Sequence, residues 1–204
     1  MDGDGGQLSQ ITEFSSAIPD WFPSGDRLIF NSDSRLEPND TPDLYAMNLD
    51  GSDLVEIIDV DEVADFAGHV SPDGSQVVFN STRSGVAHVY VADIDGGNLI
   101  QLTEGEQSRL GSDISPDGAW ILYYAYSAGD QVDLYKMRLD GSEKTQLTDL
   151  PGAKYDGAWS PDGERITFVY VQQQFPVLYL MNADGSNLVQ ISPEGMAIIS
   201  PSWH

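Results

Sequence analysis

The sequence has no cysteine, only nine lysine and arginine residues against 33 aspartates and glutamates, and no long apolar run. The absence of cysteine excludes disulfide bonds and thiolate chemistry, and is compatible with a reducing or an oxidising compartment. Without an apolar stretch of about 18 residues we expect no membrane insertion. The opening residues, MDGDGGQLSQIT, show neither the basic nor the apolar part of a secretory leader, so we expect no leader in this chain.

The excess of acidic residues limits the classes of binding partner that we expect. A formal net charge of −24 repels the phosphates of nucleic acids and anionic lipid surfaces, and we expect no nucleic-acid partner. The same charge is compatible with a solubilising surface, with cationic partners, with bound divalent ions or with a high-salt habitat.

Short motifs of catalysis and nucleotide binding are also missing. There is no Gly-x-Ser-x-Gly nucleophile elbow, His-Glu-x-x-His, P-loop or Gly-x-Gly-x-x-Gly. The three histidines, His69, His88 and His204, offer little material for acid–base chemistry. We therefore expect no enzymatic activity and no required cofactor.

What the sequence does contain is a repeat of roughly 45 residues. Each copy has a Pro-x-Gly turn, an alternating strand with an aromatic residue, a second strand with a tyrosine, an Asp-Gly turn, and an apolar residue followed by a hydroxyl. Pro presets the backbone of a turn and Gly tolerates positive φ, so these turns fix where each strand pair reverses. The recurring aromatic residues are interpreted as the structural core of the repeats: Trp21, Phe30, Tyr45, Phe79, Tyr90, Tyr123, Tyr135, Trp159, Phe168, Tyr179 and Trp203.

Each copy thus predicts four short strands of period two. One such sheet cannot bury both of its apolar faces, so neighbouring copies should stack face to face as propeller blades. We predict an all-β fold, a β-propeller of four-stranded antiparallel blades, as a single domain or propeller fragment over residues 1–204. The complete repeats are expected at 17–58, 66–103, 110–148 and 155–192, with an extra outer strand at 5–12 and an extra inner strand at 197–204.

The string Trp-Ser-Pro-Asp-Gly at 159–163, with Leu-Tyr-x-Met, Asp-Gly-Ser and Gln-Leu-Thr, resembles the WD40-like (PD40) repeat of TolB-like β-propellers. The resemblance covers essentially the whole chain, although Val70 and Ile114 replace the tryptophan in two copies. It implies a non-catalytic scaffold, periplasmic or extracellular, that binds a protein, peptide or small ligand on its loops or in its channel. The α/β domain of TolB has no counterpart in these residues, so the Tol role is not carried over.

Two alternatives stay open on the same resemblance and the same residues. The repeat also occurs in propeller domains of prolyl-oligopeptidase-type serine peptidases, so the chain could be the propeller of such a hydrolase whose catalytic domain is absent here. It could instead be a structural propeller that binds calcium.

Two candidate sites follow from positions in the repeat. Asp20, His69 and Asp113 immediately precede the tryptophan position, on the innermost strand that lines a propeller channel, and are candidate ligand-binding residues. A cluster of carboxylates in the connection after the first repeat suits a hard cation such as calcium, with a solvated loop as the alternative. Its members are Asp59, Asp61, Glu62 and Asp65.

Four complete repeats and two surplus strands fit awkwardly with the six blades usual for this family. An open arc would expose a blade at each end, so we expect possible self-association through these open edges. Alternatively, the strands at 5–12 and 197–204 could meet and partly close the ring.

Overall fold

The computed structural model describes residues 9–13, 15–32, 41–58, 62–126, 131–172, 175–193, 201 and 203. These residues contain strands and turns and no α-helix, so the all-β prediction is confirmed. The strands are β1 (Ala17–Trp21), β2 (Arg27–Ser32), β3 (Asp43–Asn48), β4 (Val55–Ile58), β5 (Asp65–Val70), β6 (Gln76–Ser81), β7 (His88–Asp93), β8 (Ile100–Gln101), β9 (Arg109–Ile114), β10 (Trp120–Tyr126), β11 (Val132–Arg138), β12 (Thr145–Gln146), β13 (Ala153–Trp159), β14 (Arg165–Gln172), β15 (Phe175–Asn182) and β16 (Val189–Gln190).

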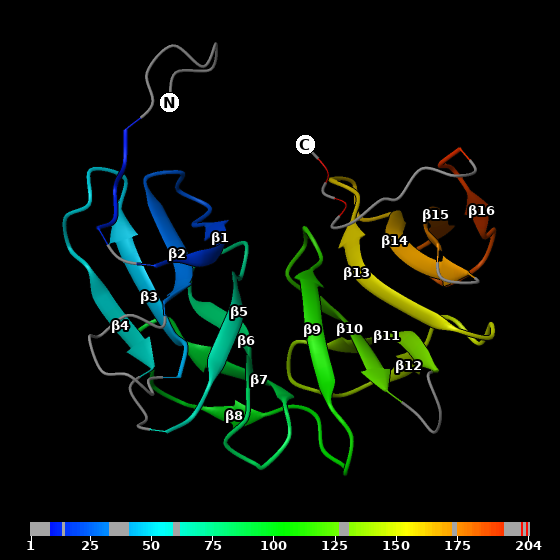
Figure 1. Ribbon diagram of the computed structural model, residues 1–204, viewed down its shortest axis with the longest axis horizontal. Helices are drawn as coiled ribbons and strands as arrows, with labels where there is room; N and C mark the ends of the chain where they lie inside the picture. Colours follow the sequence, from blue (N-terminus) through cyan, green and yellow to red (C-terminus); the bar gives the residue numbers. More distant parts are fainter. Residues whose placement is uncertain are drawn as a thin grey trace.

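The strands form successive antiparallel meanders. One sheet has the order β1-β2-β3-β4 and another β5-β6-β7-β8. The remaining strands form one larger sheet, because Val132 of β11 pairs in parallel with Ala153 of β13 and joins the meander β9–β12 to β13–β16. We call the four meanders sheets 1 to 4. Figure 1 shows them in order around an arc, with β1, β5, β9 and β13 toward the middle, and the described strands do not close this arc into a ring.

The Ser-Pro-Asp-Gly turns hold the first two strands of a sheet together through a compact set of hydrogen bonds. In sheet 2, the Asp73 carboxylate accepts from the Ser71 hydroxyl at 2.7 Å and from the Ser75 backbone N–H at 3.0 Å. Gly74 has φ +74°, a conformation that costs glycine little and other residues more. The turn sequence therefore sets the register of the hairpin that follows it.

The recurrent aromatic residues of the second and third strands are cross-strand partners. Phe79 lies opposite Tyr90 with ring centroids 5.9 Å apart, and Tyr123 lies opposite Tyr135 at 5.4 Å. Such pairs stabilise a sheet beyond the area they bury. The same stacking recurs in sheets 1 and 4 at Phe30 with Tyr45 and at Phe168 with Tyr179.

Among the described residues the core has three layers of apolar side chains between successive sheets, and a fourth cluster of Phe30, Tyr45 and Met47 within sheet 1. Between sheets 1 and 2, Ile29 and Leu44 pack against Val77 and Phe79, and all four side chains are buried. Equivalent clusters lie between sheets 2 and 3 and between sheets 3 and 4. Sheets 2 and 3 thus bury one face against the preceding sheet and the other against the following sheet, whereas sheets 1 and 4 each pack against one described neighbour.

The repeat-core prediction is wrong at its two ends. Trp21 is 57% exposed, whereas Trp159, at the same position of sheet 4, is 5% exposed. The physical reason is that sheet 1 has no preceding sheet among the described residues against which Trp21 could pack. Trp203 is also exposed. The other predicted core aromatics are buried, apart from Tyr135 and Tyr179, which are half-buried.

Each of the innermost strands β1, β5, β9 and β13 contains a bulge, at which its pairing register with the second strand shifts. In β1, β5 and β13 a residue inside the stretch where the pairing register shifts adopts positive φ: Ile18 at 50°, Ala67 at 52° and Asp156 at 49°. For a β-branched residue such as Ile18 this conformation is strained. The bulge sits two residues before the polar position of the inner strand and so re-aims that side chain.

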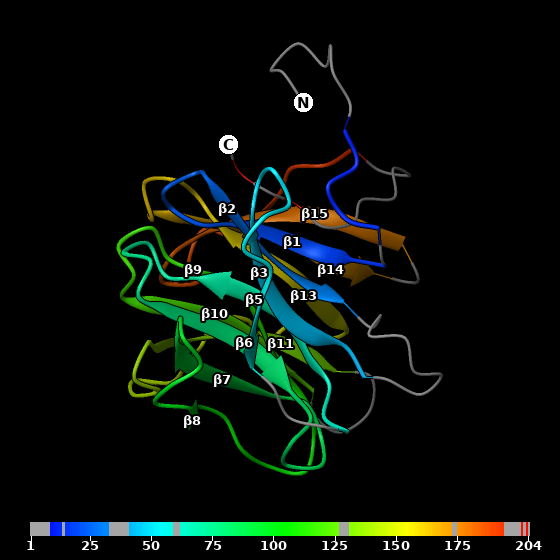
Figure 2. The same ribbon diagram turned by 90° about the vertical axis from the view of Figure 1, so that its left-hand side faces the viewer.

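The predicted extra strands are only partly described. Residues 9–12 of the expected outer strand 5–12 are not in a strand, and residues 201 and 203 of the expected inner strand 197–204 are not either; the rest of both lies outside the described residues. The beginning and the end of the described chain lie on the same side of the molecule in both views (Figures 1 and 2).

Candidate functional site: a polar row on the innermost strands

The three predicted ligand-binding residues lie on successive inner strands, Asp20 on β1, His69 on β5 and Asp113 on β9. The structure brings the first two into contact, with His69 Nδ1 3.2 Å from Asp20 Oδ2. All three side chains are half-buried. The corresponding position of sheet 4 is Ala158, so the row has polar groups on three sheets and an apolar fourth member.

The two carboxylates of this polar row also connect neighbouring sheets. Asp113 accepts from the backbone N–H of Ile114 at 2.8 Å and, across the joint to sheet 4, from the N–H of Trp159 at 2.7 Å. Asp20 accepts from its neighbour Trp21 at 2.8 Å and from the backbone N–H of Val70 in sheet 2. The row therefore combines exposed oxygen atoms with a structural role in holding the inner strands together.

Burial and mutual charge shift the pKa values of the row. Burial alone would lower the pKa of His69, but the hydrogen bond and charge of Asp20, aided by the charge of Asp113, outweigh it and raise this pKa. Burial would raise the pKa of Asp20, yet the contact with His69 lowers it. At Asp113 burial prevails over the attraction of His69 and raises the pKa. The charges of both carboxylates thus favour the protonated imidazole of His69.

This arrangement can accept hydrogen bonds and attract a cation, since two carboxylates flank one imidazole. Among the residues the structure describes, no three His, Asp or Glu side chains are grouped closely enough to hold a metal ion. The described residues also include no helix long and apolar enough to cross a membrane.

The predicted calcium cluster is not assembled by the described residues. Asp59 and Asp61 lie outside them, and Glu62 is exposed. Asp65 is completely buried and accepts from Arg83 Nη2 at 2.8 Å, while burial raises its pKa. Asp65 thus forms a buried ion pair with Arg83 within sheet 2, and the calcium site, whose other members lie largely outside the described residues, stays a prediction.

Sequence reasoning missed the polar groups at the joints between sheets. Asn31 accepts from the backbone N–H of Ala67 at 3.0 Å, and Asn80 accepts from that of Gly111 at 2.8 Å, so each asparagine holds the bulge region of the next sheet. The signal was available, since both residues follow the aromatic residue of the second strand. The residue at that position in sheet 3 is Tyr124, whose ring makes an edge contact with Tyr155, centroids 5.7 Å apart.

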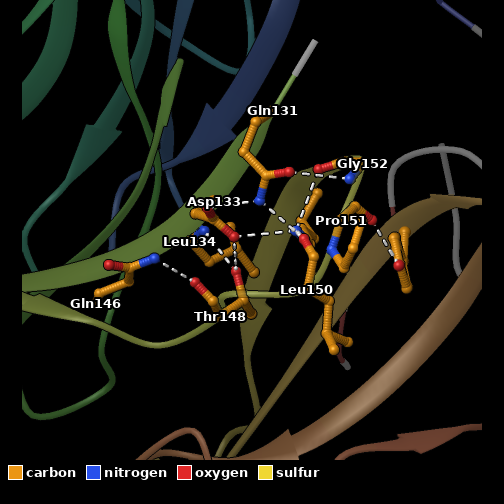
Figure 3. Close-up of polar contacts among 10 residues, drawn as sticks. Gln131, Asp133, Leu134, Gln146, Thr148, Leu150, Pro151 and Gly152 are labelled. Carbon is orange, nitrogen blue, oxygen red and sulfur yellow. Dashed lines mark hydrogen bonds and ion pairs between the residues drawn. The ribbon is translucent and has the colours of Figure 1, made fainter. Parts of the chain in front are cut away.

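A buried lysine at the joint of sheets 3 and 4 was also missed. Lys154 is fully buried and its ammonium group donates to Asp133 at 2.9 Å and to the carbonyl oxygens of Leu150 and Gly152. Figure 3 shows Asp133 also receiving hydrogen bonds from Gln131 at 2.8 Å and from Thr148 at 2.9 Å. Every charge in this network is paired, which is the condition for burying ions.

Comparison with sequences of known proteins agrees with this architecture. The family described as the TolB beta propeller domain (PD40) matches residues 2–204. An uncharacterized protein of Agrobacterium fabrum is 35% identical over 144 residues, which are 65% of this chain and 49% of that protein. A TolB homolog of Chlorobium chlorochromatii is 34% identical over 144 residues, covering 70% of this chain and 32% of the homolog.

Solved structures agree as well. A TolB candidate from Agrobacterium tumefaciens superposes with a TM-score of 0.78 at 24% identity, over 91% of this chain and 65% of that one. TolB from Acinetobacter baumannii superposes with a TM-score of 0.75 at 20% identity, over 94% of this chain and 47% of that one. This chain spans about half the length of the Agrobacterium fabrum relative and about a third of the TolB homolog. With a repeat that matches along residues 2–204, the chain belongs to the TolB β-propeller (PD40) family.

Proposed function

We propose that this chain is a non-catalytic β-propeller scaffold that binds a cationic segment of a protein or peptide over the polar row. The supporting observation is the placement of Asp20 and Asp113 on either side of His69, on three successive inner strands. The side chains of Asp20 and His69 keep 35% and 24% of their surface exposed, so a partner can reach them. The net charge of −24 would steer a cationic partner toward the scaffold.

The proposed location is the periplasm or the extracellular space. The matching relatives include TolB homologs, and the resemblance in sequence extends to bacterial extracytoplasmic proteins. The absence of cysteine is compatible with this oxidising environment.

The test uses a short arginine-rich peptide as probe and a glutamate-rich peptide of the same length as its control. Calorimetry is expected to give binding of the arginine peptide alone, weakened several-fold by Asp113→Asn and by Asp20→Asn. Each change removes the charge and keeps one of the two side-chain oxygens as an acceptor for a backbone N–H group. Asp140→Asn, on an exposed turn of sheet 3, is the matched control for total charge. Equal weakening by all three variants would contradict binding at the row.

As part of this proposal, the four sheets are four consecutive blades of an open ring. The carbonyl oxygen of Ile11 lies 3.1 Å from the place a Cβ on Gly51 would occupy, and that of Leu147 lies 2.8 Å from the equivalent place at Gly185. The segment around Ile11 therefore lies against sheet 1 in the same position in which the end of the outer strand of sheet 3, at Leu147, lies against sheet 4. The exposed Trp21 marks the open edge.

We expect this edge to associate with a second copy, because an exposed indole at a blade face is an association surface. Light scattering should give a mass above 22.2 kDa that rises with concentration, and Trp21→Asp should return it to 22.2 kDa. A wild-type chain that stays monomeric at every concentration would contradict this part of the proposal.

A further inference from the structure

A groove separate from the polar row lies between the Pro-Asp-Gly turns of sheets 3 and 4. It has a volume of about 160 Å³. Two indoles and an ammonium group line it, Trp120 of β10, Trp159 of β13 and Lys136 of β11, together with the turn aspartates Asp117 and Asp162. The groove thus combines hydrogen-bond donors, carboxylate acceptors and an apolar wall in a small space.

The donors of this groove are held in place by the fold. Lys136 donates from Nζ to the carbonyl oxygen of Ala183 at 2.8 Å and lies 4.6 Å from the ring centroid of Trp120. The guanidinium of Arg138 lies 3.9 Å from the same ring, a cation–π contact that fixes the indole. One ammonium hydrogen of Lys136 is used by Ala183, and an ammonium group carries three.

Trp159 supplies a donor that the described part of the chain leaves without a partner. Its side chain is 5% exposed, and no described group accepts a hydrogen bond from its buried indole N–H. A buried donor that stays unpaired costs about 1–3 kcal/mol. Trp159 lines the groove, but its indole N–H itself has no exposed surface, so a molecule in the groove supplies the missing acceptor once the indole turns toward it on binding.

The acceptors come from the two turns. The hydrogen bonds that Asp117 and Asp162 receive from their own turns go to Oδ1 of each carboxylate. The second oxygen of each can therefore accept from a ligand, since a carboxylate has about four lone-pair sites.

The chain contains an internal comparison. The groove between the same turns of sheets 2 and 3 is larger, about 300 Å³, and is lined by Ser71, Pro72, Asp73, Asp117, Gly118 and Leu139. The repeat positions of Trp120, Lys136 and Trp159 are taken there by Gln76, Val91 and Ile114. Both indoles and the ammonium group are therefore particular to the joint of sheets 3 and 4, while the turn aspartates are general to the repeat.

We propose that the groove between sheets 3 and 4 binds a small neutral polyhydroxylated ligand, a single sugar ring. Its hydroxyl oxygens accept from the indole N–H of Trp159 and from Lys136, and its hydroxyl hydrogens are donated to Asp117 and Asp162. An anion would meet the two carboxylates and a cation would meet the ammonium group. At about 30 Å³ per water the groove has room for about five waters, which suits one ring. This site does not depend on the function proposed for the polar row.

The probes for the test are glucose, galactose and N-acetylglucosamine, with sodium acetate and ammonium chloride as charged controls. The indole N–H signals of ¹⁵N-labelled protein are followed by NMR, and Trp159→Phe assigns the Trp159 signal. We expect at least one sugar to shift the Trp120 and Trp159 signals in a saturable way, and neither salt to do so.

Three variants of groove residues and one control variant test whether the sugar response depends on the groove. Trp159→Phe keeps a ring without the N–H, and Lys136→Val copies sheet 2; each should weaken the response of the Trp120 signal roughly tenfold, as expected for one lost hydrogen bond. Asp162→Asn should weaken it, whereas Asp73→Asn, the same turn position in sheet 2, should leave it unchanged. Thermal melting checks that each variant is folded.

Two results would overturn the proposal. One is the absence of a saturable shift with any of the three sugars, which would leave the indole N–H hydrated by water only. The other is an unchanged sugar response in folded Trp159→Phe. Asp20→Asn tests the polar row, and the hydrogen bonds of Asp20 involve Trp21, His69 and Val70 but no residue of the groove. It should leave the sugar response intact, so the two proposals fail separately.

Discussion

The joint between sheets 2 and 3 and the joint between sheets 3 and 4 occupy the same place in the repeat and use different chemistry. In the first, the buried amide of Asn80 accepts from Gly111 across the joint. In the second, Tyr124 takes that position and contacts Tyr155, while the joint is held by the buried pair of Lys154 and Asp133. The repeat thus fixes the apolar layers and leaves the polar contacts between sheets free to vary.

The difference extends to the backbone. At the joint of sheets 3 and 4 the strands β11 and β13 pair directly in parallel, whereas sheets 2 and 3 have no such strand pairing and remain separate sheets. The carbonyl oxygens that receive the Lys154 ammonium group belong to Leu150 and Gly152, which immediately precede β13. The buried charge therefore anchors the segment that leads into sheet 4.

The largest expected effect comes from removing the buried cation. Lys154→Met keeps the length of the side chain and leaves the Asp133 carboxylate buried without its counter-ion, which typically costs 3–5 kcal/mol, so we expect a loss of about that size. Urea unfolding of the variant measures it.

The matched control for this change is the double variant Lys154→Met with Asp133→Leu. Replacing both partners of a buried pair by apolar groups is often nearly neutral, so the double variant should recover most of the lost stability. A single variant that loses less than about 1 kcal/mol would show that the pair does not hold this joint.

A smaller effect is expected at the amide joint. Asn80→Ala leaves the backbone N–H of Gly111 without its acceptor, and we expect a loss of about 1–3 kcal/mol in the free energy of unfolding. Asn48→Ala, which removes side-chain contacts with Ser52 and Asp53 on an exposed turn, is the control and should change stability by less than about 0.5 kcal/mol. Equal losses in both variants would remove the distinction between joint and surface amides.

The smallest effect concerns the contact of sheets 1 and 2 through His69 and Asp20. The pKa of His69 is raised in the folded chain, so its stabilisation is complete below the ordinary histidine pKa and is lost as the pH rises through the raised value. The pKa of Asp20 is lowered, so its part is lost as the pH falls through that lowered value. Between these limits the contact between His69 and Asp20 should contribute less than about 1 kcal/mol to the free energy of unfolding, because Asp20 is partly exposed.

This pH dependence is measured by unfolding the wild type and His69→Gln across a pH series. The stability difference between them should shrink as the pH rises from the ordinary histidine pKa of 6.5 through the raised pKa of His69, where the imidazole loses its charge. Parallel curves over that range would contradict the coupling of His69 to Asp20.

The sequence was sufficient for the strands and turns because the local signals agree. Pro72, Asp73 and Gly74 place a turn, and Phe79 with Tyr90 places a hairpin, without reference to the rest of the molecule. The placement of Asp20, His69 and Asp113 on successive inner strands could likewise be predicted from their common position before the tryptophan site. The hydrogen bonds that Asp20 and Asp113 accept from backbone N–H groups of the next sheet could not be predicted, because they depend on the bulges.

Other features depend on contacts between sheets that periodicity does not specify. Lys154 occupies a position at which the other sheets have Asp65 and Arg109, so no repeated residue type marked it as buried. The exposure of Trp21 depends on whether another sheet packs against sheet 1. The repeat motif places Trp21 and Trp159 at the same position and therefore cannot distinguish the exposed residue from the buried one.

The most direct test of the account is the pKa of His69, measured by NMR titration of its imidazole in the wild type, Asp20→Asn and Asp113→Asn. The central claim is that the inner strands of three successive sheets meet in one polar row. It predicts a His69 pKa above the ordinary 6.5, a large fall in Asp20→Asn and a smaller fall in Asp113→Asn. A His69 pKa at or below 6.5 that neither substitution changes would contradict the claim.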